Sequence, residues 1–415
     1  MIEKVLRAGS LAPLQHKEYR SFLATRFFYT MALRMVTTVV AYQLFQLTKS
    51  SFSIGLVGLA EFVPVFSLAL YAGHVIDQSD KRSLFFKGIL AYSVCVLALL
   101  LLTMPTIEGR LSLPVLELGF YLVIFFTGII RAFVGPTATA IIAQLVPRPI
   151  LHLAANLNST TYLSASIIGH ATGGFCIAWF GVHATFYIII AYVLIAAFFV
   201  SRIGKKPILH QKANIKTWES VKAGLQYVFR HKILLSTISL DLFAVLFGGA
   251  VALIPEFAER ILQVGPIGFG WLNAAVDIGS MLMIVTITLF PLKKNQGKIL
   301  LLAVAGFGIC IIVFGLSQIF WMSFVVLVIA GMMDGISVVI RGTVLQLTTP
   351  DEMRGRVSAV NSMFINSSNE LGQFESGFTA RAFGTVPAVI FGGSMTLLVV
   401  IVTWLKAPGL RKFEY

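Results

Sequence analysis

The sequence predicts an all-α membrane protein of twelve transmembrane helices, because of its composition, its apolar segments and its charge distribution. Of 415 residues, 57% are hydrophobic and 12% are charged, which is about half the charged share of a soluble domain. A helical crossing needs roughly 20 mainly apolar residues. We place such stretches at 19–48, 53–76, 83–104, 114–143, 150–179, 183–203, 232–259, 266–290, 298–316, 319–348, 354–383 and 385–406.

The distribution of positive charge predicts the orientation of these helices. If both termini lie on one side, the segments on that side hold 24 of the 32 Lys and Arg residues, and the opposite loops hold only Lys49, Arg110, Arg260 and Arg381. Loops rich in Lys and Arg stay in the cytoplasm, so we expect both termini to be cytoplasmic. The net charge of +14 therefore reflects topology and gives no reason to expect a nucleic-acid partner.

An internal repeat predicts two similar halves. A shift of 203 residues aligns ten identical residues, from Gly128 on Gly331 to Gly181 on Gly384, and eight of them fall within 158–181 without a gap. We expect an N-terminal six-helix half at 1–203, a basic cytoplasmic linker at 204–231 and a C-terminal six-helix half at 232–415. Parallel halves with a central site near mid-membrane are a transporter architecture. Within the linker, 215–232 has the pattern of an amphipathic helix, lying either on the inner leaflet or packed against the protein.

Three segments resemble the major facilitator superfamily. "GHVIDQSDKR" (73–82) resembles its charged loop between the second and third helices, with Gln78 where Arg is usual. "GIIRAFVGPTATAIIAQLVP" (128–147) and "TPDEMRGRVSAVNSMF" (349–364) resemble the branch that contains the enterobactin exporter and the third drug:proton antiporter family. The resemblance covers nearly the whole chain and implies the major facilitator fold and a transport function.

The resemblance also implies roles for particular residues. The superfamily's gating loop corresponds here to Gly73, Asp77, Asp80, Lys81 and Arg82, where we expect Gly73 to permit close helix approach. In the family, the residue matching Asp77 latches the two halves at the cytoplasmic end of the eleventh helix, where Arg354 and Arg356 lie in this chain. The arginine corresponding to Arg131 is implicated in proton coupling.

Charged residues inside predicted spans are the candidates for proton coupling. A charge at mid-helix costs roughly 2.5–3.5 kcal/mol on insertion scales, so such residues are functional hypotheses, with a structural ion pair as the alternative. The repeat pairs Arg131 with Asp334, and we expect these opposite charges to face each other. Glu61 could pair with Arg26 or Arg34, and Asp241 could instead cap its helix. The full set of candidates is Arg26, Arg34, Glu61, Arg131, His170, Asp241, Asp334, Glu370 and Glu375.

His170 lies in a sequence that resembles the antiporter signature of the fifth helix. That signature reads Gly-Pro-x-x-Gly-Gly, and here it is Gly169-His170-Ala171-Thr172-Gly173-Gly174. The four-residue spacing of Gly169 and Gly173 predicts a seam where helices approach closely. No further His, Cys or carboxylate stands at ligand spacing, so we expect no metal site.

These features favour a secondary transporter over an enzyme. The sequence holds no phosphate-binding lysine loop, nucleophile elbow or paired-His motif, and we expect no cofactor. We expect a monomer in the bacterial inner membrane, in contact with membrane lipid. We expect it to export small amphiphilic or aromatic molecules, siderophore-like or drug-like, in exchange for protons. Uptake, transport of a metal ion or lipid, or a receptor that transports nothing are the alternatives.

Replacing Asp77 tests the expected latch. Asp77→Asn removes the charge that would hold the cytoplasmic ends of the two halves together, so the population should shift towards the inward-facing state. Labelling of single cysteines from the cytoplasmic side should therefore increase in a background where Cys95, Cys176 and Cys310 are replaced. Unchanged labelling would reject the latch.

Overall fold

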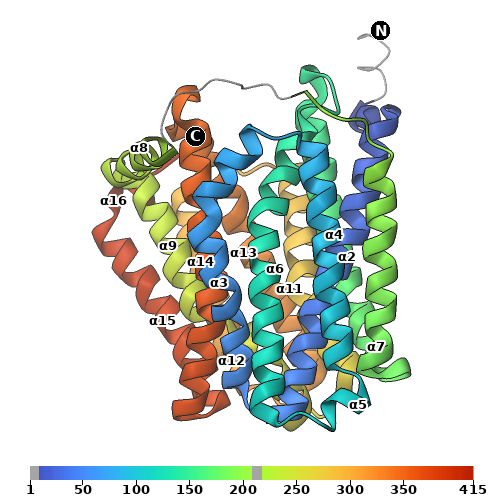
Figure 1. The fold of residues 1–415 in the computed structure, drawn as a ribbon. Helices are drawn as coiled ribbons and strands as arrows, with labels where there is room; N and C mark the ends of the chain where they lie inside the picture. Colours follow the sequence, from blue (N-terminus) through green and yellow to red (C-terminus); the bar gives the residue numbers. More distant parts are fainter. Residues whose placement is uncertain (1–8, 208–216, 415) are drawn as a thin grey trace. The chain divides into compact units, whose positions relative to one another are not determined.

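The computed structural model describes residues 9–207 and 217–414, and its regular elements within these ranges are helices (Figure 1). The long helices are α2 (Lys17–Thr48), α3 (Ser51–Asp77), α4 (Lys81–Leu102), α6 (Leu113–Ile142), α7 (Leu151–Ser201), α9 (Lys232–Gly248), α11 (Gly265–Leu289), α12 (Gln296–Leu316), α13 (Phe320–Thr348), α14 (Asp351–Phe383) and α15 (Thr385–Lys406). The shorter ones are η1 (Gly9–Gln15), α5 (Pro105–Glu108), η2 (Arg148–Ile150), α8 (Thr217–Arg230), η3 (Ala250–Leu253), α10 (Ile254–Glu256), η4 (Phe257–Ile261) and α16 (Pro408–Arg411).

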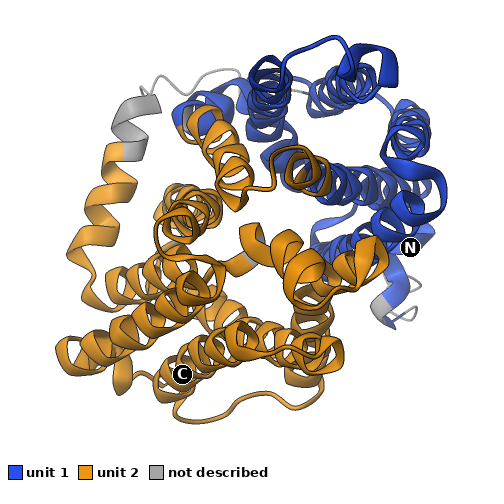
Figure 2. Cartoon of the chain, turned by 90° about the horizontal axis from the view of Figure 1, so that it is seen from below, with its two compact units in different colours: residues 1–40, 67–214 blue, residues 41–66, 215–415 orange. Residues whose placement is uncertain are grey.

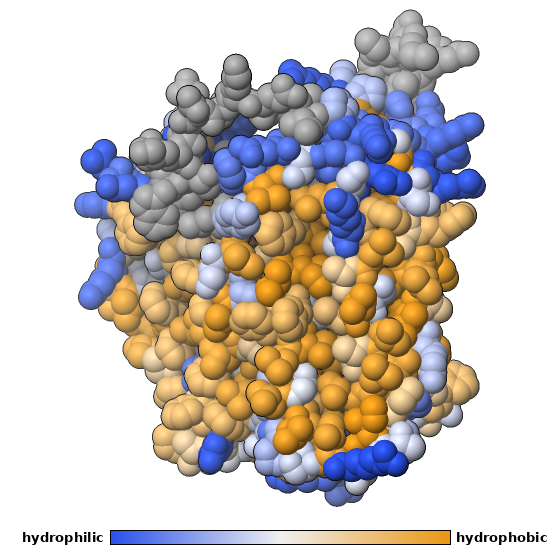
Figure 3. Space-filling view, in the orientation of Figure 1, coloured by the Kyte–Doolittle hydropathy of each residue, from blue (hydrophilic) through white to orange (hydrophobic). Residues whose placement is uncertain are grey.

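Eight stretches of the described residues are long and apolar enough to cross a membrane, or nine if the bent pair of α8 and α9 is one span. The sequence led us to expect twelve. Two helices, α2 and α14, are 32 and 33 residues long but fall outside the eight because they are more polar. On the face drawn in Figure 3, hydrophobic side chains cover the middle of the helices and hydrophilic ones gather near their ends.

Helix α7 is too long for one crossing and is broken by a glycine. Its 51 residues would extend about 76 Å at 1.5 Å per residue, whereas a hydrocarbon core is about 30 Å thick. Gly181 breaks it, with φ 80° and ψ 169°. Gly384, its partner under the 203-residue shift, separates α14 from α15 with φ 90° and ψ 162°. Only glycine adopts this backbone region readily, so the repeat preserves a required turn.

The chain divides into two compact units, each described here by itself (Figure 2). Unit 1 comprises Met1–Val40 and Ser67–Asn214, and unit 2 comprises Ala41–Phe66 and Ile215–Tyr415. Helices α2 and α3 therefore each pass from one unit to the other partway along their length. Residues 41–66 lie in the first half of the sequence, but their contacts group them with unit 2.

In unit 1, the loop between α3 and α4 is fastened to the end of α7. Asp80 caps α4 by accepting hydrogen bonds from the backbone N–H of Arg82 at 3.1 Å and from the hydroxyl of Ser83 at 2.6 Å. It also accepts from the backbone N–H of Lys206 at 3.0 Å. Arg82 donates to the carbonyl oxygens of Ser201 and Ile203 at 3.1 and 3.0 Å, which α7 leaves without helical partners.

These hydrogen bonds change the acidity of Asp80. Partial burial by itself would raise the pKa of this carboxyl. The hydrogen bonds from the hydroxyl of Ser83 and the backbone of Lys206 and Arg82 outweigh that effect and hold the pKa below its ordinary value. The folded protein therefore favours the carboxylate.

The other residues in and next to this loop differ in how far they are exposed. Lys81 is buried, Asp77 is exposed at the end of α3, and Gly73 is exposed. A Cβ added at Gly73 would meet no atom within 4 Å. The close helix approach that we expected at Gly73 is therefore wrong for this structure.

In unit 2, α8 packs against the protein. It meets α9 at an angle of 101°, and Gly224 lies against the backbone of Arg356 at the start of α14. Leu225 and Val228 pack into an apolar cluster with residues of α9, α13 and α14. Of the two alternatives for this amphipathic helix, the described residues favour packing; residues 215 and 216 and the side chains of Trp218 and Val221 lie outside the described part.

Helix α9 ends earlier than expected. We placed this span at 232–259, but the helix stops at Gly248, and Gly249 is followed by the short elements η3, α10 and η4. Two consecutive glycines and Pro255 disfavour a continuous helix here. The result is an irregular stretch at 249–261, which shapes a pocket described below.

Asp80→Ala tests the fastening of α4 to α7. Loss of the cap should cost about 1 kcal/mol and lower the melting temperature of the detergent-solubilised protein. Because the folded pKa of Asp80 lies below the unfolded one, its contribution is present above the unfolded pKa and disappears as pH falls through the folded pKa. The difference from the unmodified protein should therefore shrink on acidification. The exposed Gln78→Ala serves as control, and equal melting of both variants would contradict the assignment.

Candidate functional site: buried charges in the two units

An ion pair lies inside the membrane-spanning part of unit 2. The carboxylate of Asp241, on α9, pairs with the guanidinium of Arg341, on α13. Asp241 is buried, and Arg341 also donates from Nε to the carbonyl oxygen of Ser337 at 3.3 Å. Asp241 is the tenth residue of α9, so it does not cap this helix. The alternative of a helix cap is therefore excluded.

A small cavity adjoins this pair. It measures about 10 Å³, which is near the minimum that holds one water molecule. Its polar lining comes from Asp241, Asp334 and Ser337, and its apolar lining from Ala244, Val245, Val304, Phe307 and Met333. The carboxyl of Asp277, on α11, acts electrostatically on Asp334. Three carboxyl groups and one guanidinium therefore share this part of unit 2.

Glycines bring α11 and α13 close enough for this arrangement. A Cβ added at Gly279 would collide with the carbonyl oxygen of Val328, and one at Gly331 would collide with that of Val276. Ser280 donates a hydrogen bond to the carbonyl oxygen of Gly331 at 3.0 Å. Helices in contact through small residues approach closely in membranes. Asp277 and Asp334 flank this contact, two residues before Gly279 and three after Gly331.

In unit 1, two arginines of α2 flank one tyrosine of α7. The guanidinium carbons of Arg26 and Arg34 lie 4.9 and 5.6 Å from the ring centroid of Tyr162, within the range of cation–π attraction. Arg34 also donates from Nη2 to the hydroxyl of Tyr162 at 2.6 Å. We call these three residues the Arg–Tyr–Arg stack.

The glycines of α7 hold α2 beside this stack. A Cβ added at Gly169 would lie 2.8 Å from the carbonyl oxygen of Met31, and one at Gly173 would lie 3.3 Å from Cβ of Thr38. His170 is buried, and its Nδ1 is 2.8 Å from the hydroxyl of Thr38. Gly174 is also buried. The small residues thus lie where α7 contacts α2, and His170 occupies a hydrogen-bonded position there.

The other candidates are described within their own units. Arg131, on α6, acts electrostatically on Tyr29 of α2. On α14, Glu370 is buried and accepts a hydrogen bond from Gln373 at 3.2 Å, whereas Glu375 accepts one from Thr379 at 2.8 Å. Glu61 is half-buried on α3. The pairing of Arg131 with Asp334 involves two units and stays a prediction.

Polar residues of 41–66 bind the irregular stretch of unit 2. Glu259 accepts hydrogen bonds from Gln46 at 2.6 Å and from Lys49 at 2.7 Å. Arg260 pairs with Glu256 at 2.8 Å and donates to the carbonyl oxygen of Lys49 at 3.0 Å. We call these side chains, Gln46, Lys49, Glu256, Glu259 and Arg260, the outer cluster, because the expected topology places them opposite the termini.

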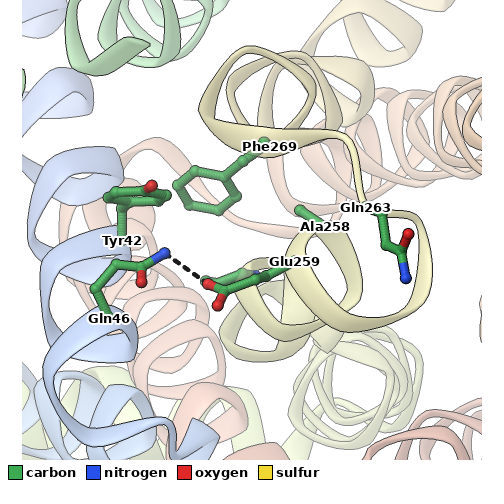
Figure 4. A pocket seen from close by; sticks show the side chains of 8 residues that line it. Tyr42, Gln46, Ala258, Glu259, Gln263 and Phe269 are labelled. Carbon is green, nitrogen blue, oxygen red and sulfur yellow. Dashed lines mark hydrogen bonds between the residues drawn. The ribbon is translucent and has the colours of Figure 1, made fainter.

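A pocket of about 240 Å³ adjoins the outer cluster. Figure 4 shows Tyr42 and Gln46 of α2 facing Phe269 and Glu259 across it, with the hydrogen bond from Gln46 to Glu259 dashed. The rings of Tyr42 and Phe269 are 6.1 Å apart. Also in unit 2, Gly55 of α3 and Gly377 of α14 meet so closely that a Cβ on Gly377 would lie 2.9 Å from Cα of Gly55.

A family comparison decides the class of this protein. The transmembrane secretion effector family (MFS_3) matches residues 8–414. The chain belongs to the transmembrane secretion effector family of the major facilitator superfamily. This transmembrane secretion effector is therefore a transporter and not an enzyme, as the sequence indicated.

The known proteins that are similar to this chain align with it over nearly the full length of both. The enterobactin exporter EntS of Shigella flexneri is 23% identical over 399 residues, covering 96% of this chain and 94% of the exporter. That of Escherichia coli O1:K1 / APEC is 22% identical over the same length. Among solved structures, a D-xylose-proton symporter has a TM-score of 0.76 at 12% identity, covering 96% of this chain and 99% of the symporter. The nucleoside transporter NupG has 0.74 at 14%, covering 96% and 100%.

The secretion effector's structure adds residues that sequence reasoning missed. Arg341 is the partner of Asp241, and Tyr162 joins Arg26 to Arg34. The signal for the first was in the sequence, because Arg341 lies inside the predicted span 319–348. Within the described residues, no group of three or more His, Cys, Asp or Glu side chains is arranged to hold a metal ion.

A double-mutant cycle tests the buried pair of this secretion effector. Asp241→Asn or Arg341→Gln alone leaves an uncompensated charge and should destabilise the protein by about 3–5 kcal/mol. The double variant should be more stable than either single variant, because both charges are gone. Thermal unfolding in detergent measures the three variants, and strictly additive effects would show that the pair is not coupled.

Proposed function

We propose that this transporter exports small amphiphilic or aromatic molecules from the bacterial cytoplasm in exchange for protons, by alternating access. The observation that carries the proposal is a water-sized cavity lined by Asp241 and Asp334, of which Asp241 pairs with Arg341 and Asp334 interacts electrostatically with Asp277. Ionisable residues inside membrane spans are expensive and mark proton and substrate pathways.

Binding of a proton changes the net charge of these four residues. When Asp334 is protonated, one negative charge leaves a region that holds three carboxyl groups and a single guanidinium. Protonation of Asp241 would weaken its pair with Arg341. Under the proposal, protons enter from outside, neutralise one of these carboxyls and leave on the cytoplasmic side. Asp334 would alternate between this cluster and Arg131, its repeat partner.

The architecture that we propose has twelve crossings in two parallel halves, 1–203 and 232–415, joined by 204–231. Support comes from α7, whose 51 residues are long enough for two crossings and are broken at Gly181, and from α2 and α14, which are long enough to span. We place both termini in the cytoplasm and the protein in the bacterial inner membrane as a monomer. The positive-inside distribution of Lys and Arg supports this orientation.

Alternating access also requires contacts that break. We propose that the outer cluster and the meeting of Gly55 with Gly377 close the exit pathway, and that they separate when the substrate leaves. At the cytoplasmic end, Asp77 would latch onto Arg354 and Arg356. The outer cluster and the proposed Asp77 latch combine charges with partly exposed positions, so their rearrangement exchanges protein contacts for water at little cost.

The relatives favour a siderophore as one possible cargo, since their name specifies enterobactin export. Drug-like and lipid-like amphiphiles belong to the same size and polarity class.

Proton flux in liposomes tests the coupling. With enterobactin as the probe, an imposed pH gradient should drive movement of the probe and be dissipated by it. Asp334→Asn should abolish gradient-driven movement, whereas Glu117→Gln, a carboxyl-to-amide change near the start of α6, should retain it. Movement that ignores the gradient would reject proton coupling, and movement along the direction of proton entry would indicate uptake.

A further inference from the structure

The charges inside the two units have opposite signs. The membrane-spanning part of unit 1 contains the arginines Arg26, Arg34 and Arg131, and the acidic residues in the described part of unit 1 lie near helix ends or in loops. The corresponding part of unit 2 contains six carboxyls and one guanidinium. The carboxyls are those of Glu61, Asp241, Asp277, Asp334, Glu370 and Glu375. Because buried charge is costly, the arginines of unit 1 and the carboxyls of unit 2 each call for a functional explanation.

Within the Arg–Tyr–Arg stack, Arg26 leaves a hydrogen-bond donor available. A guanidinium that attracts a ring through its face keeps its N–H groups in its own plane, where they match a carboxylate or phosphate. The Nε of Arg26 is buried and has no hydrogen-bond partner among the described residues. A buried donor without a partner costs about 1–3 kcal/mol, so an acceptor arriving there would be stabilising.

Close packing of α2 against α7 and a hydrogen bond position the stack. Tyr162, Gly169 and Gly173 lie seven and then four residues apart on α7, so they share one face of that helix. Gly169 lets α2 approach so closely that an added Cβ would be 2.9 Å from Cβ of Arg34. The hydroxyl of Tyr162 is fixed by Arg34 at 2.6 Å. Such preorganisation lowers the entropic cost of binding.

The position of the stack suits a transported headgroup. Arg26 and Arg34 are the tenth and eighteenth residues of the 32-residue helix α2, so they lie at depths of about 14 and 26 Å along a helix of about 48 Å. Both arginines and Tyr162 are half-buried. A ligand that reaches them places its charged end towards mid-membrane, where Tyr162 offers an aromatic face.

We propose that the Arg–Tyr–Arg stack binds the anionic headgroup of the transported amphiphile, such as a carboxylate, sulfonate or phosphate. The inference rests on the proposed export function and specifies its substrate class. Two positive charges repel a cationic headgroup, whereas a planar anion can accept paired hydrogen bonds from a guanidinium. The carboxyls of unit 2 then remain for protons.

Equilibrium binding with matched probes tests this site. The probes are 4-butylbenzoate, 4-butylbenzamide and 4-butylbenzylamine, which share ring and tail and differ in headgroup charge. Calorimetry on the full-length protein in nanodiscs, without a pH gradient, should show tightest binding for the benzoate. Arg26→Gln and Arg34→Gln should each weaken benzoate binding at least about tenfold and leave benzamide binding unchanged. Arg110→Gln, in an exposed loop of the same unit, should bind like the unmodified protein.

Three results would overturn the proposal: absent benzoate binding, amine or amide binding as tight as that of the benzoate, or unchanged benzoate affinity in both arginine variants. Unaltered benzamide binding shows that a variant is folded. Since no proton gradient is present, these results are separate from the flux experiment. Anion selectivity can fail while Asp334-dependent export stands, and the reverse is equally distinguishable.

Discussion

A charge between the ends of these helices must be compensated, and this constraint determines where the chemistry of the molecule lies. Asp241 and Arg341 satisfy it by pairing, and Ser337 binds the guanidinium as well. Arg26 and Arg34 satisfy part of it through the ring and hydroxyl of Tyr162. Each solution is strong enough to hold a charge in the membrane. Each can also be altered by adding a proton or a ligand.

Close helix contacts place these charges. Gly279 and Gly331 let α11 and α13 touch, which brings Asp277 near Asp334, and Gly169 does the same for α2 and α7 beside Tyr162. Apolar side chains contribute no hydrophobic driving force between helices in lipid, so van der Waals packing at small residues decides which helices approach. The glycines therefore have a functional consequence, because they determine which ionisable groups interact.

The sequence was sufficient for the fold class and for the family, because apolar stretches and motifs depend on local residue order. The repeat also paired Gly181 with Gly384, although the turn at each of them was seen only in the structure. Partnerships between distant residues were less accessible: Asp241 with Arg341 and Arg26 with Tyr162 depend on which helix faces meet. The early end of α9 was missed because the apolar residues continue past Gly248, and Gly73 was misjudged because a motif carries no information about the neighbours present in one conformation.

Infrared difference spectroscopy during a pH titration in nanodiscs tests most directly the central claim, that carboxyls of unit 2 carry the transported proton. A protonated carboxyl in a membrane has a C=O stretching band distinct from that of the carboxylate. We expect this band to appear on acidification in the unmodified protein and in Glu117→Gln, and to be lost or strongly reduced in Asp334→Asn. A band that persists unchanged in Asp334→Asn, or no titrating band at all, would contradict the claim.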